Sequence, residues 1–169
     1  IDHYVVFVDG TDVAHTTLLT FTVEGLTNGV EYSFTVAAHN AAGNGAASSA
    51  VLAIPFTLPG APTNLTAALN GTLVQLTWSA PADDGGSAID HYIVYRNGED
   101  VVHTFGTSYS YLEFEMGTHT FAVAAHNAAG DSELSASVEI VVSHVPSAPL
   151  ALEATAGNGQ VQLNWSAPA

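Results

Sequence analysis

Histidine is the residue type in this sequence best suited to bind a metal ion, and it occurs eight times. Six of the histidines stand at matched positions, namely His3, His15 and His39 and then His91, His103 and His126. His91 and His126 are the candidate metal ligands, because both have outward parity in the strand pattern described below. A catalytic zinc takes three protein ligands, and two imidazoles fall short of that number. We therefore expect an exposed polar pair and no metal site.

A short acidic stretch is the other group of residues that could bind a cation. Asp83 and Asp84 are adjacent within residues 81–86, and Asp90 follows closely. Calcium binds clustered carboxylate and carbonyl oxygens, and a bridging calcium ion would stiffen an array of modules. The spacing of these acids matches no defined calcium-binding loop. We expect a solvated turn, so the sequence predicts neither a metal ion nor any other cofactor.

The sequence contains no arrangement that predicts catalysis. Ser, His and Asp are plentiful, but they fall at repeated positions in alternating segments. There is no nucleophile elbow and no glycine-rich phosphate loop ahead of a helix. The absence of Cys excludes disulfides, thiolate metal sites and cysteine nucleophiles. We predict that the chain is not an enzyme.

Charge restricts the partners that the chain can have. One Lys or Arg stands against 16 Asp and Glu, which gives a net charge of −15. Such a chain repels phosphate backbones and anionic lipid headgroups. The most apolar run, residues 50–56, is too short to span a bilayer and is interrupted by Pro55. Nucleic-acid binding and membrane insertion are therefore not expected.

Three Asn-x-Ser/Thr tripeptides are candidate glycosylation sites, at Asn64, Asn70 and Asn164. Asn70 lies in an expected turn and Asn164 on the outward face of an expected strand. A glycan at either position would not collide with a core.

The chain repeats itself with a period of about 87 residues. Ile89-Asp90-His91-Tyr92 repeats the first four residues, and Ala125-His126-Asn127-Ala128-Ala129-Gly130 repeats residues 38–43. Further on, Gln162-Leu163-Asn164-Trp165-Ser166-Ala167-Pro168-Ala169 repeats residues 75–82 with one change. A period of this length predicts small modules. It divides the chain into an incomplete module at 1–58, a complete one at 59–145 and the opening of a third at 146–169.

Alternating apolar and polar residues predict short strands and no helix. Val74, Leu76 and Trp78 alternate with polar residues, and Phe121, Val123 and Ala125 line another inward face. Asn97-Gly98 predicts a tight two-residue hairpin. Seven such strands with turns between them are typical of an all-β sandwich.

These segments resemble a fibronectin type III module. The resemblance lies in the Pro59-Gly60-Ala61-Pro62 entry, in Val74-x-Leu76-x-Trp78, and in Leu26-Thr27-Asn28-Gly29-Val30-Glu31-Tyr32 with the residues that follow it to Gly43. It implies tandem Ig-like sandwiches of seven strands, A to G. Residues 1–58 would then hold strands C to G, and residues 146–169 strands A and B.

The resemblance also places individual side chains. Strands C and F pair in this family, so His91 and His126 are expected to be cross-strand neighbours. In the hairpin register, His15 and His103 are expected opposite Tyr4 and Tyr92. Tyr32 matches the family's corner tyrosine, whereas the central module has His119 there. His119 is expected to replace the hydroxyl with a ring nitrogen, or else to loosen the module in acid.

Residues 1–58 would leave Tyr4, Phe21, Phe34 and Val36 uncovered, and a two-stranded ribbon is marginal alone. Strands completing each end could come from a longer polypeptide or from a neighbouring copy joined head to tail. The sequence predicts an extracellular or cell-surface structural array, namely a stalk, adhesin or filament. Its expected partner is itself, with cell-surface or glycan ligands as further candidates. The alternative is a spacer or carbohydrate-contacting module of a secreted polysaccharide-degrading enzyme.

Overall fold

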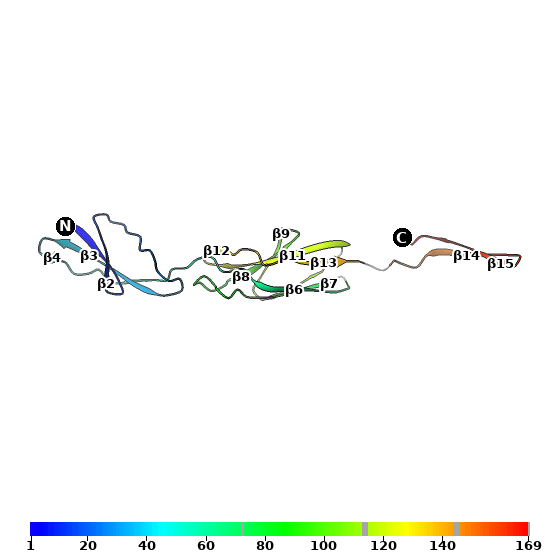
Figure 1. The fold of residues 1–169 in the computed structure, drawn as a ribbon, viewed down its shortest axis with the longest axis horizontal. Coiled ribbons are helices and arrows are strands. Elements are labelled where there is room, and N and C mark those ends of the chain that lie inside the picture. Colours follow the sequence, from blue (N-terminus) through cyan, green and yellow to red (C-terminus); the bar gives the residue numbers. More distant parts are fainter. Residues whose placement is uncertain (72, 113–114, 144–145, 169) are drawn as a thin grey trace.

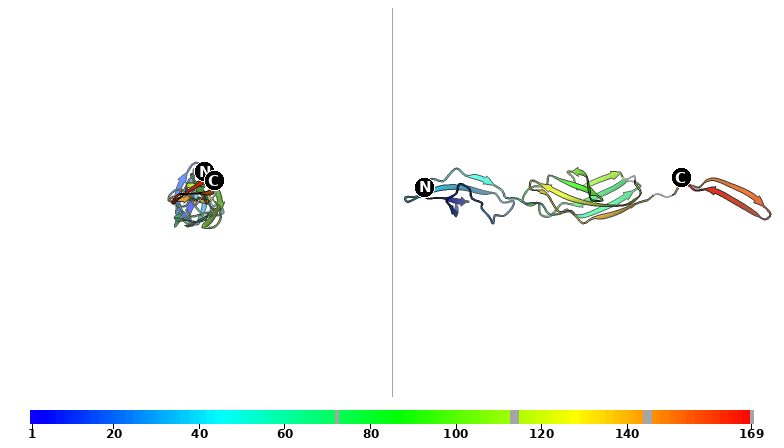
Figure 2. Two further views of the ribbon diagram at one scale, coloured as in Figure 1. Left: turned by 90° about the vertical axis from the view of Figure 1, so that its right-hand side faces the viewer. Right: turned by 90° about the horizontal axis from the view of Figure 1, so that it is seen from above.

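The protein is built from strands and loops that form three parts in a row (Figure 1). The computed structural model describes residues 1–71, 73–112, 115–143 and 146–168. None of these residues forms a helix, so none forms one long and apolar enough to cross a membrane. Figure 2 shows the same row from above and, end on, its narrow cross-section. The all-β prediction is confirmed.

The strands formed by the described residues fall into four sheets. In chain order their bounds are β1 His3–Val8, β2 Thr11–Thr16, β3 Tyr32–Asn40, β4 Gly43–Asn44, β5 Val51–Ala53, β6 Thr63–Asn70, β7 Leu73–Ser79, β8 His91–Arg96, β9 Glu99–Thr104, β10 Ser108–Leu112, β11 Gly117–Asn127, β12 Gly130–Asp131, β13 Val138–Val142, β14 Leu150–Gly157 and β15 Gln160–Ser166.

The central sandwich, β6 to β13, contains the closed core. A sheet ordered β10-β7-β6 packs on a sheet ordered β12-β11-β8-β9, with β13 beside β11. Apolar side chains alternate inward from both sheets, as a pleated strand requires. The most buried of them include Val74, Leu76, Phe121, Val123 and Ala125. These are among the residues that alternation predicted to face the core.

The β8–β9 hairpin turns where the sequence predicts it. Asn97 and Gly98 both have positive φ, 52° and 86°, which suits the right-handed twist of the strands. The pairing then shifts, with Val94 opposite Val102 but Tyr95 opposite Asp100. This bulge moves the rest of β9 by one residue.

The first sheet, β1 to β5, is the counterpart of only half of that sandwich. Its order is β2-β1-β3-β4, with β5 beside β3. Residues 21–23 match part of β10 in the repeat, yet they form no strand. The reason is pairing: β10 bonds to β7, and the first sheet has no counterpart of β7. The expected C-to-G strand set is therefore short of its E strand.

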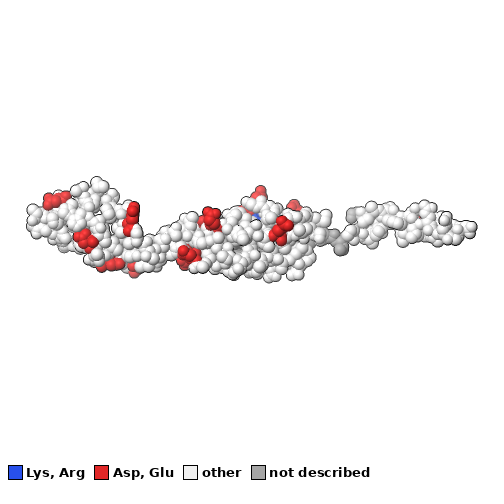
Figure 3. Space-filling view, in the orientation of Figure 1, with Lys and Arg blue, Asp and Glu red and all other residues white. Residues whose placement is uncertain are grey.

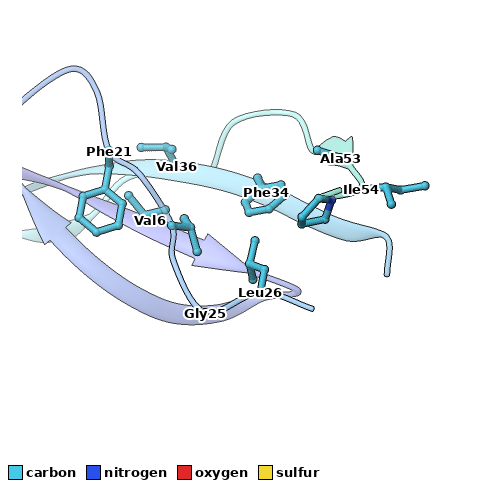
Figure 4. Close-up of a pocket in the computed structure, with 10 residues that line it drawn as sticks. Val6, Phe21, Gly25, Leu26, Phe34, Val36, Ala53 and Ile54 are labelled. Atoms are coloured by element: carbon cyan, nitrogen blue, oxygen red, sulfur yellow. The ribbon is translucent and has the colours of Figure 1, made fainter. Parts of the chain in front are cut away.

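Without a covering sheet, one face of the first sheet stays open. Val36 is 40% exposed, whereas its repeat counterpart Val123 is fully buried. Phe21 and Ile54 are also about half exposed. Figure 4 shows Val6, Phe21, Phe34 and Val36 around this hollow of about 590 Å³. Apolar side chains that a second sheet covers in the central sandwich are therefore accessible to solvent here.

The terminal hairpin, β14 and β15, repeats the geometry of β6 and β7. Both hairpins shift register near the start, where Asn64 and Ala151 have φ of 54° and 51°. Leu163 and Trp165 are more than half exposed, while their counterparts Leu76 and Trp78 are buried. The hairpin therefore presents the same apolar face as β6 and β7, without the sheet that covers it there.

Candidate functional site

Three segments meet at the junction between the first sheet and the central sandwich. They are the linker at 57–62, the loop at 83–86 and the turn at 127–130, and we call them together the junction. The linker lies against the loop through two backbone hydrogen bonds. Thr57 N–H donates to the Gly85 carbonyl and Gly60 N–H donates to the Asp83 carbonyl, both at 2.9 Å. Pro59 and Pro62 of the linker are buried, so the sandwich holds the linker along its length.

Asn127 ties the linker to the loop. Its side-chain amide is fully buried and donates to the Thr57 carbonyl at 2.9 Å and to the Asp84 carbonyl at 2.7 Å. Its Oδ1 accepts the Ala129 N–H at 2.8 Å, which shapes the turn. The Nδ2 atom therefore binds the linker and the loop, and the Oδ1 atom binds the turn. An amide, with two N–H donors and an acceptor oxygen, suits that task.

The acidic residues of the loop shape their own backbone. Asp83 Oδ1 accepts the Gly85 N–H at 2.9 Å, and Asp84 Oδ1 accepts the Gly86 N–H at 2.8 Å. Both carboxylates face solvent, as expected of a turn. The calcium alternative gains no support from this arrangement, because each carboxylate holds the adjacent turn.

Glycines let the two parts approach closely. Gly85 and Gly86 have φ of 75° and 83°, a region that favours glycine. A Cβ on Gly86 would lie 2.2 Å from the Gly29 nitrogen, and one on Gly85 would lie 2.2 Å from the Thr57 carbonyl oxygen. Gly29 N–H in turn donates to the Pro55 carbonyl at 2.9 Å. The loop of the sandwich thus packs directly on the first sheet's 26–29 turn.

Sequence reasoning missed this site. The sequence predicts a solvated turn within residues 81–86 and gives no role to the side chain of Asn127. The available signal was the Gly85-Gly86 pair, together with an Asn repeated at 40 and 127. Two glycines in one loop indicate a close backbone approach, but the approaching segment cannot be read from the chain.

Six of the histidines form two stacked rows, one on the first sheet and one on the central sandwich. His91 stacks on His126 and on His103, with ring centroids 4.5 and 4.9 Å apart. His3 stacks on His39 and His15 at 4.3 and 4.8 Å. The predicted pairing of His91 with His126 is confirmed.

The expected positions of His15 and His103 are wrong by one residue. His103 lies opposite Ile93 and His15 opposite Val5. The bulge in each hairpin shifts the register, which turns these imidazoles onto the face that carries His91 and His3.

Acidic side chains lie at the ends of the rows. Asp131 Oδ1 lies 2.6 Å from His126 Nδ1, and Asp100 Oδ2 lies 2.9 Å from His103 Nε2. In the first row, His15 Nδ1 also lies 3.0 Å from His3 Nε2. In the described part of the chain, no cluster of three or more His, Asp or Glu could hold a metal ion.

His119 occupies the corner position as a buried structural residue. Its Nε2 lies 3.2 Å from the Glu115 carbonyl, which can only accept, so this nitrogen carries the proton. Its Nδ1 lies 3.5 Å from Asn97 Nδ2. In the first sheet the Tyr32 hydroxyl instead accepts the Thr27 N–H at 3.0 Å. The ring nitrogen of His119 thus takes the place of the tyrosine hydroxyl, but it donates to a backbone carbonyl, whereas the hydroxyl accepts from a backbone N–H.

The glycosylation candidates are accessible. Asn64, Asn70 and Asn164 are all exposed. Thr72, the third residue of the Asn70 tripeptide, lies outside the described residues. Glycosylation at these positions stays a prediction.

Charge on the visible face consists almost wholly of scattered acids (Figure 3). Tyr109 and Tyr111, which would have to be free to stack on a sugar, are partly buried and pack against the core. Arg96 lies 5.1 Å from the Tyr111 ring centre. The junction is therefore the candidate functional site. Its hydrogen bonds hold the linker, the loop and the turn together.

Comparison with known proteins identifies the repeated unit. The profile named "Fibronectin type III domain" matches residues 1–54 and 60–141. Exoglucanase B of Cellulomonas fimi is 35% identical over 153 residues, which cover 85% of this chain and 14% of that protein. Chitinase A1 of Niallia circulans is 37% identical over 122 residues, covering 66% of this chain and 17% of that protein. The chain thus spans a small fraction of these relatives.

Among solved structures, domains A168–A170 of titin match with a TM-score of 0.64 at 22% identity, covering 83% of this chain and 55% of that one. At this identity the similarity concerns the fold alone. It shows that tandem Ig-like domains superpose on more than one unit of this chain.

Proposed function

Because the chain belongs to the fibronectin type III family, we propose that it is a non-catalytic spacer that holds its neighbours at a fixed distance and orientation in an extracellular protein. The observation that carries the proposal is the junction. Asn127 bonds to the linker and to the loop, and Gly86 packs on the first sheet's turn. A linker held in this way resists bending, whereas a free one of Gly and Ser would not.

The relatives support a spacer in a secreted polysaccharide-degrading enzyme, which was the alternative in the sequence analysis. Fibronectin type III units occur in proteins named Exoglucanase B and Chitinase A1. Each relative is far longer than this chain, so a catalytic domain elsewhere would do the chemistry. The hypothesis of a stalk, adhesin or filament rests on the internal sequence repeat alone, and the names of these relatives do not support it.

Backbone relaxation by nuclear magnetic resonance tests the spacer. We expect residues of β1 to β5 and of the central sandwich to report one common tumbling time, as a rigid pair does. Independent tumbling of the two parts would contradict the proposal. Sedimentation with insoluble cellulose and chitin separates a spacer from a carbohydrate-contacting module, because a spacer stays in the supernatant.

Self-association is a second candidate, favoured by the two open apolar faces. The terminal hairpin exposes Leu163 and Trp165, and the first sheet exposes Phe21 and Val36. The hairpin of one copy could cover the sheet of another, as β6 and β7 cover the sandwich, and such a contact propagates. Size exclusion over a range of concentrations tests it, because complementation gives larger species at high concentration and a spacer alone gives none.

A further inference from the structure

The turn at 40–43 of the first sheet has the same construction as the turn that holds the linker in the central sandwich. Both have the sequence Asn-Ala-Ala-Gly. Asn40 Oδ1 accepts the Ala42 N–H at 2.9 Å, as Asn127 Oδ1 accepts the Ala129 N–H at 2.8 Å. Gly43 and Gly130 have φ of 119° and 129°. The two turns therefore present an asparagine amide in the same local geometry.

The surroundings of the two amides differ. Asn127 is fully buried and donates to the linker and the loop. Asn40 is exposed, and its Nδ2 donates to no atom of the described residues. Beside it is a hollow of about 320 Å³ lined by Ile1, His39, Asn40, Gly43 and Gly45 among others.

In the central sandwich the corresponding space is used by the linker. A methyl carbon of Leu58 lies 3.2 Å from the position of a Cβ on Gly130, and the Thr57 carbonyl accepts from Asn127. Around Gly43, by contrast, a Cβ would meet no atom within 4 Å. The turn at 127–130 is therefore covered by the linker, whereas the matching turn at 40–43 has no segment packed on it in the described residues.

We propose that Asn40 and this hollow are the docking site for the linker that enters the first unit, a proline-containing segment of the kind found at 57–62. The recognition is of backbone carbonyls, so the docked segment needs an extended backbone, with an apolar residue before proline to lie over Gly43. The proposal rests on the spacer function and extends it, since the same amide would fix every junction of an array.

The proposal is tested by inserting a copy of residues 55–88 ahead of Ile1, which restores the linker, the β6–β7 hairpin and the loop in the order they have in the central sandwich. We expect the Asn40 side-chain amide protons to become protected from solvent exchange, as we also expect for those of the buried, hydrogen-bonded Asn127. In this extended chain, Asn40→Ala should lower the equilibrium ratio of folded to unfolded protein. The factor by which it falls should be at least ten times the factor that the same substitution causes in the original chain.

Equal effects of Asn40→Ala in the two chains would overturn the proposal. So would an extended chain that stays unfolded, because the inserted residues already fold in this arrangement in the central sandwich. Protection of Asn40 in the original chain at high concentration would also overturn it, since the occupant would then be a second copy. None of these results would contradict the spacer function. Its test is the common tumbling of the first sheet and the central sandwich, which does not depend on Asn40.

Discussion

The sharpest prediction compares Asn127→Ala with Asn40→Ala in the same chain. Both substitutions remove the Oδ1 that accepts an N–H two residues on, at 2.8 and 2.9 Å. Only Asn127→Ala also removes the amide that binds the Thr57 and Asp84 carbonyls. The two substitutions therefore differ chiefly in the loss of the hydrogen bonds to the linker and the loop.

The expected difference follows from those two bonds. A hydrogen bond within a protein contributes about 0.5–1.5 kcal/mol net, so two give about 1–3 kcal/mol. Asn127→Ala should therefore lower the free energy of unfolding of the central sandwich by at least that much, whereas Asn40→Ala, in the first sheet, should leave it nearly unchanged. Since Asn127 is fully buried, the small void left behind adds to the cost and does not reduce it.

Urea unfolding followed by tryptophan fluorescence measures this difference. Trp78 lies in the sandwich core and Trp165 is exposed on the terminal hairpin, so a Trp165→Phe background leaves one probe in the right place. The slope of unfolding free energy against urea should stay the same while the midpoint falls. Equal midpoints for Asn127→Ala and Asn40→Ala would refute the reasoning, because the amide would then hold nothing.

Three further predictions concern the junction, the corner and the core. Gly86→Ala should separate the first sheet from the sandwich, because its Cβ would lie 2.2 Å from the Gly29 nitrogen, and small-angle scattering should show a wider range of shapes. Gly98→Ala is the matched control, since Gly98 has φ of 86° but no atom within 4 Å of a Cβ. His119→Ala should cost about 1–3 kcal/mol in urea unfolding, because a buried residue and its bond to the Glu115 carbonyl are lost, while a loss below about 0.5 kcal/mol would argue against a structural corner. Burial raises the pKa of Tyr92 above 10.0, so the folded state keeps this phenol protonated after the unfolded chain has begun to ionise. Its contribution to stability is complete below pH 10.0 and is lost as the pH rises toward the folded-state pKa. Tyr92→Phe should reduce the fall in melting temperature as the pH is raised above 10.0. An unchanged dependence of melting temperature on pH would exclude Tyr92 as the source of this loss.

Much of the fold could be predicted because strand alternation is a local signal. Val74, Leu76 and Trp78 reveal their inward face within five residues, and Asn97 with Gly98 specifies its own turn. The pairing of His91 with His126 followed from the family's sheet order. The one-residue error for His103 arose because a bulge at Val94 and Tyr95 leaves no mark in an otherwise alternating strand.

The parts that escaped prediction depend on distant partners. Residues 21–23 have the same alternation as β10, yet they form no strand because the strand that would pair with them is absent from the first sheet. The junction escaped for a similar reason. Asn127 contacts residues 43 and 70 positions away, and a turn signal such as Asn-Ala-Ala-Gly reports only its own backbone.

The most direct test of a fixed junction is the distance between the two parts it joins. The chain has no native Cys, so Thr11→Cys on β2 and Thr118→Cys on β11, both exposed, would carry the only two nitroxide labels. Pulsed electron spin resonance should then give one narrow distance distribution, no broader than that of two labels within the central sandwich. A broad distribution would mean that the linker bends freely, and it would contradict the account of the chain as a spacer of fixed geometry.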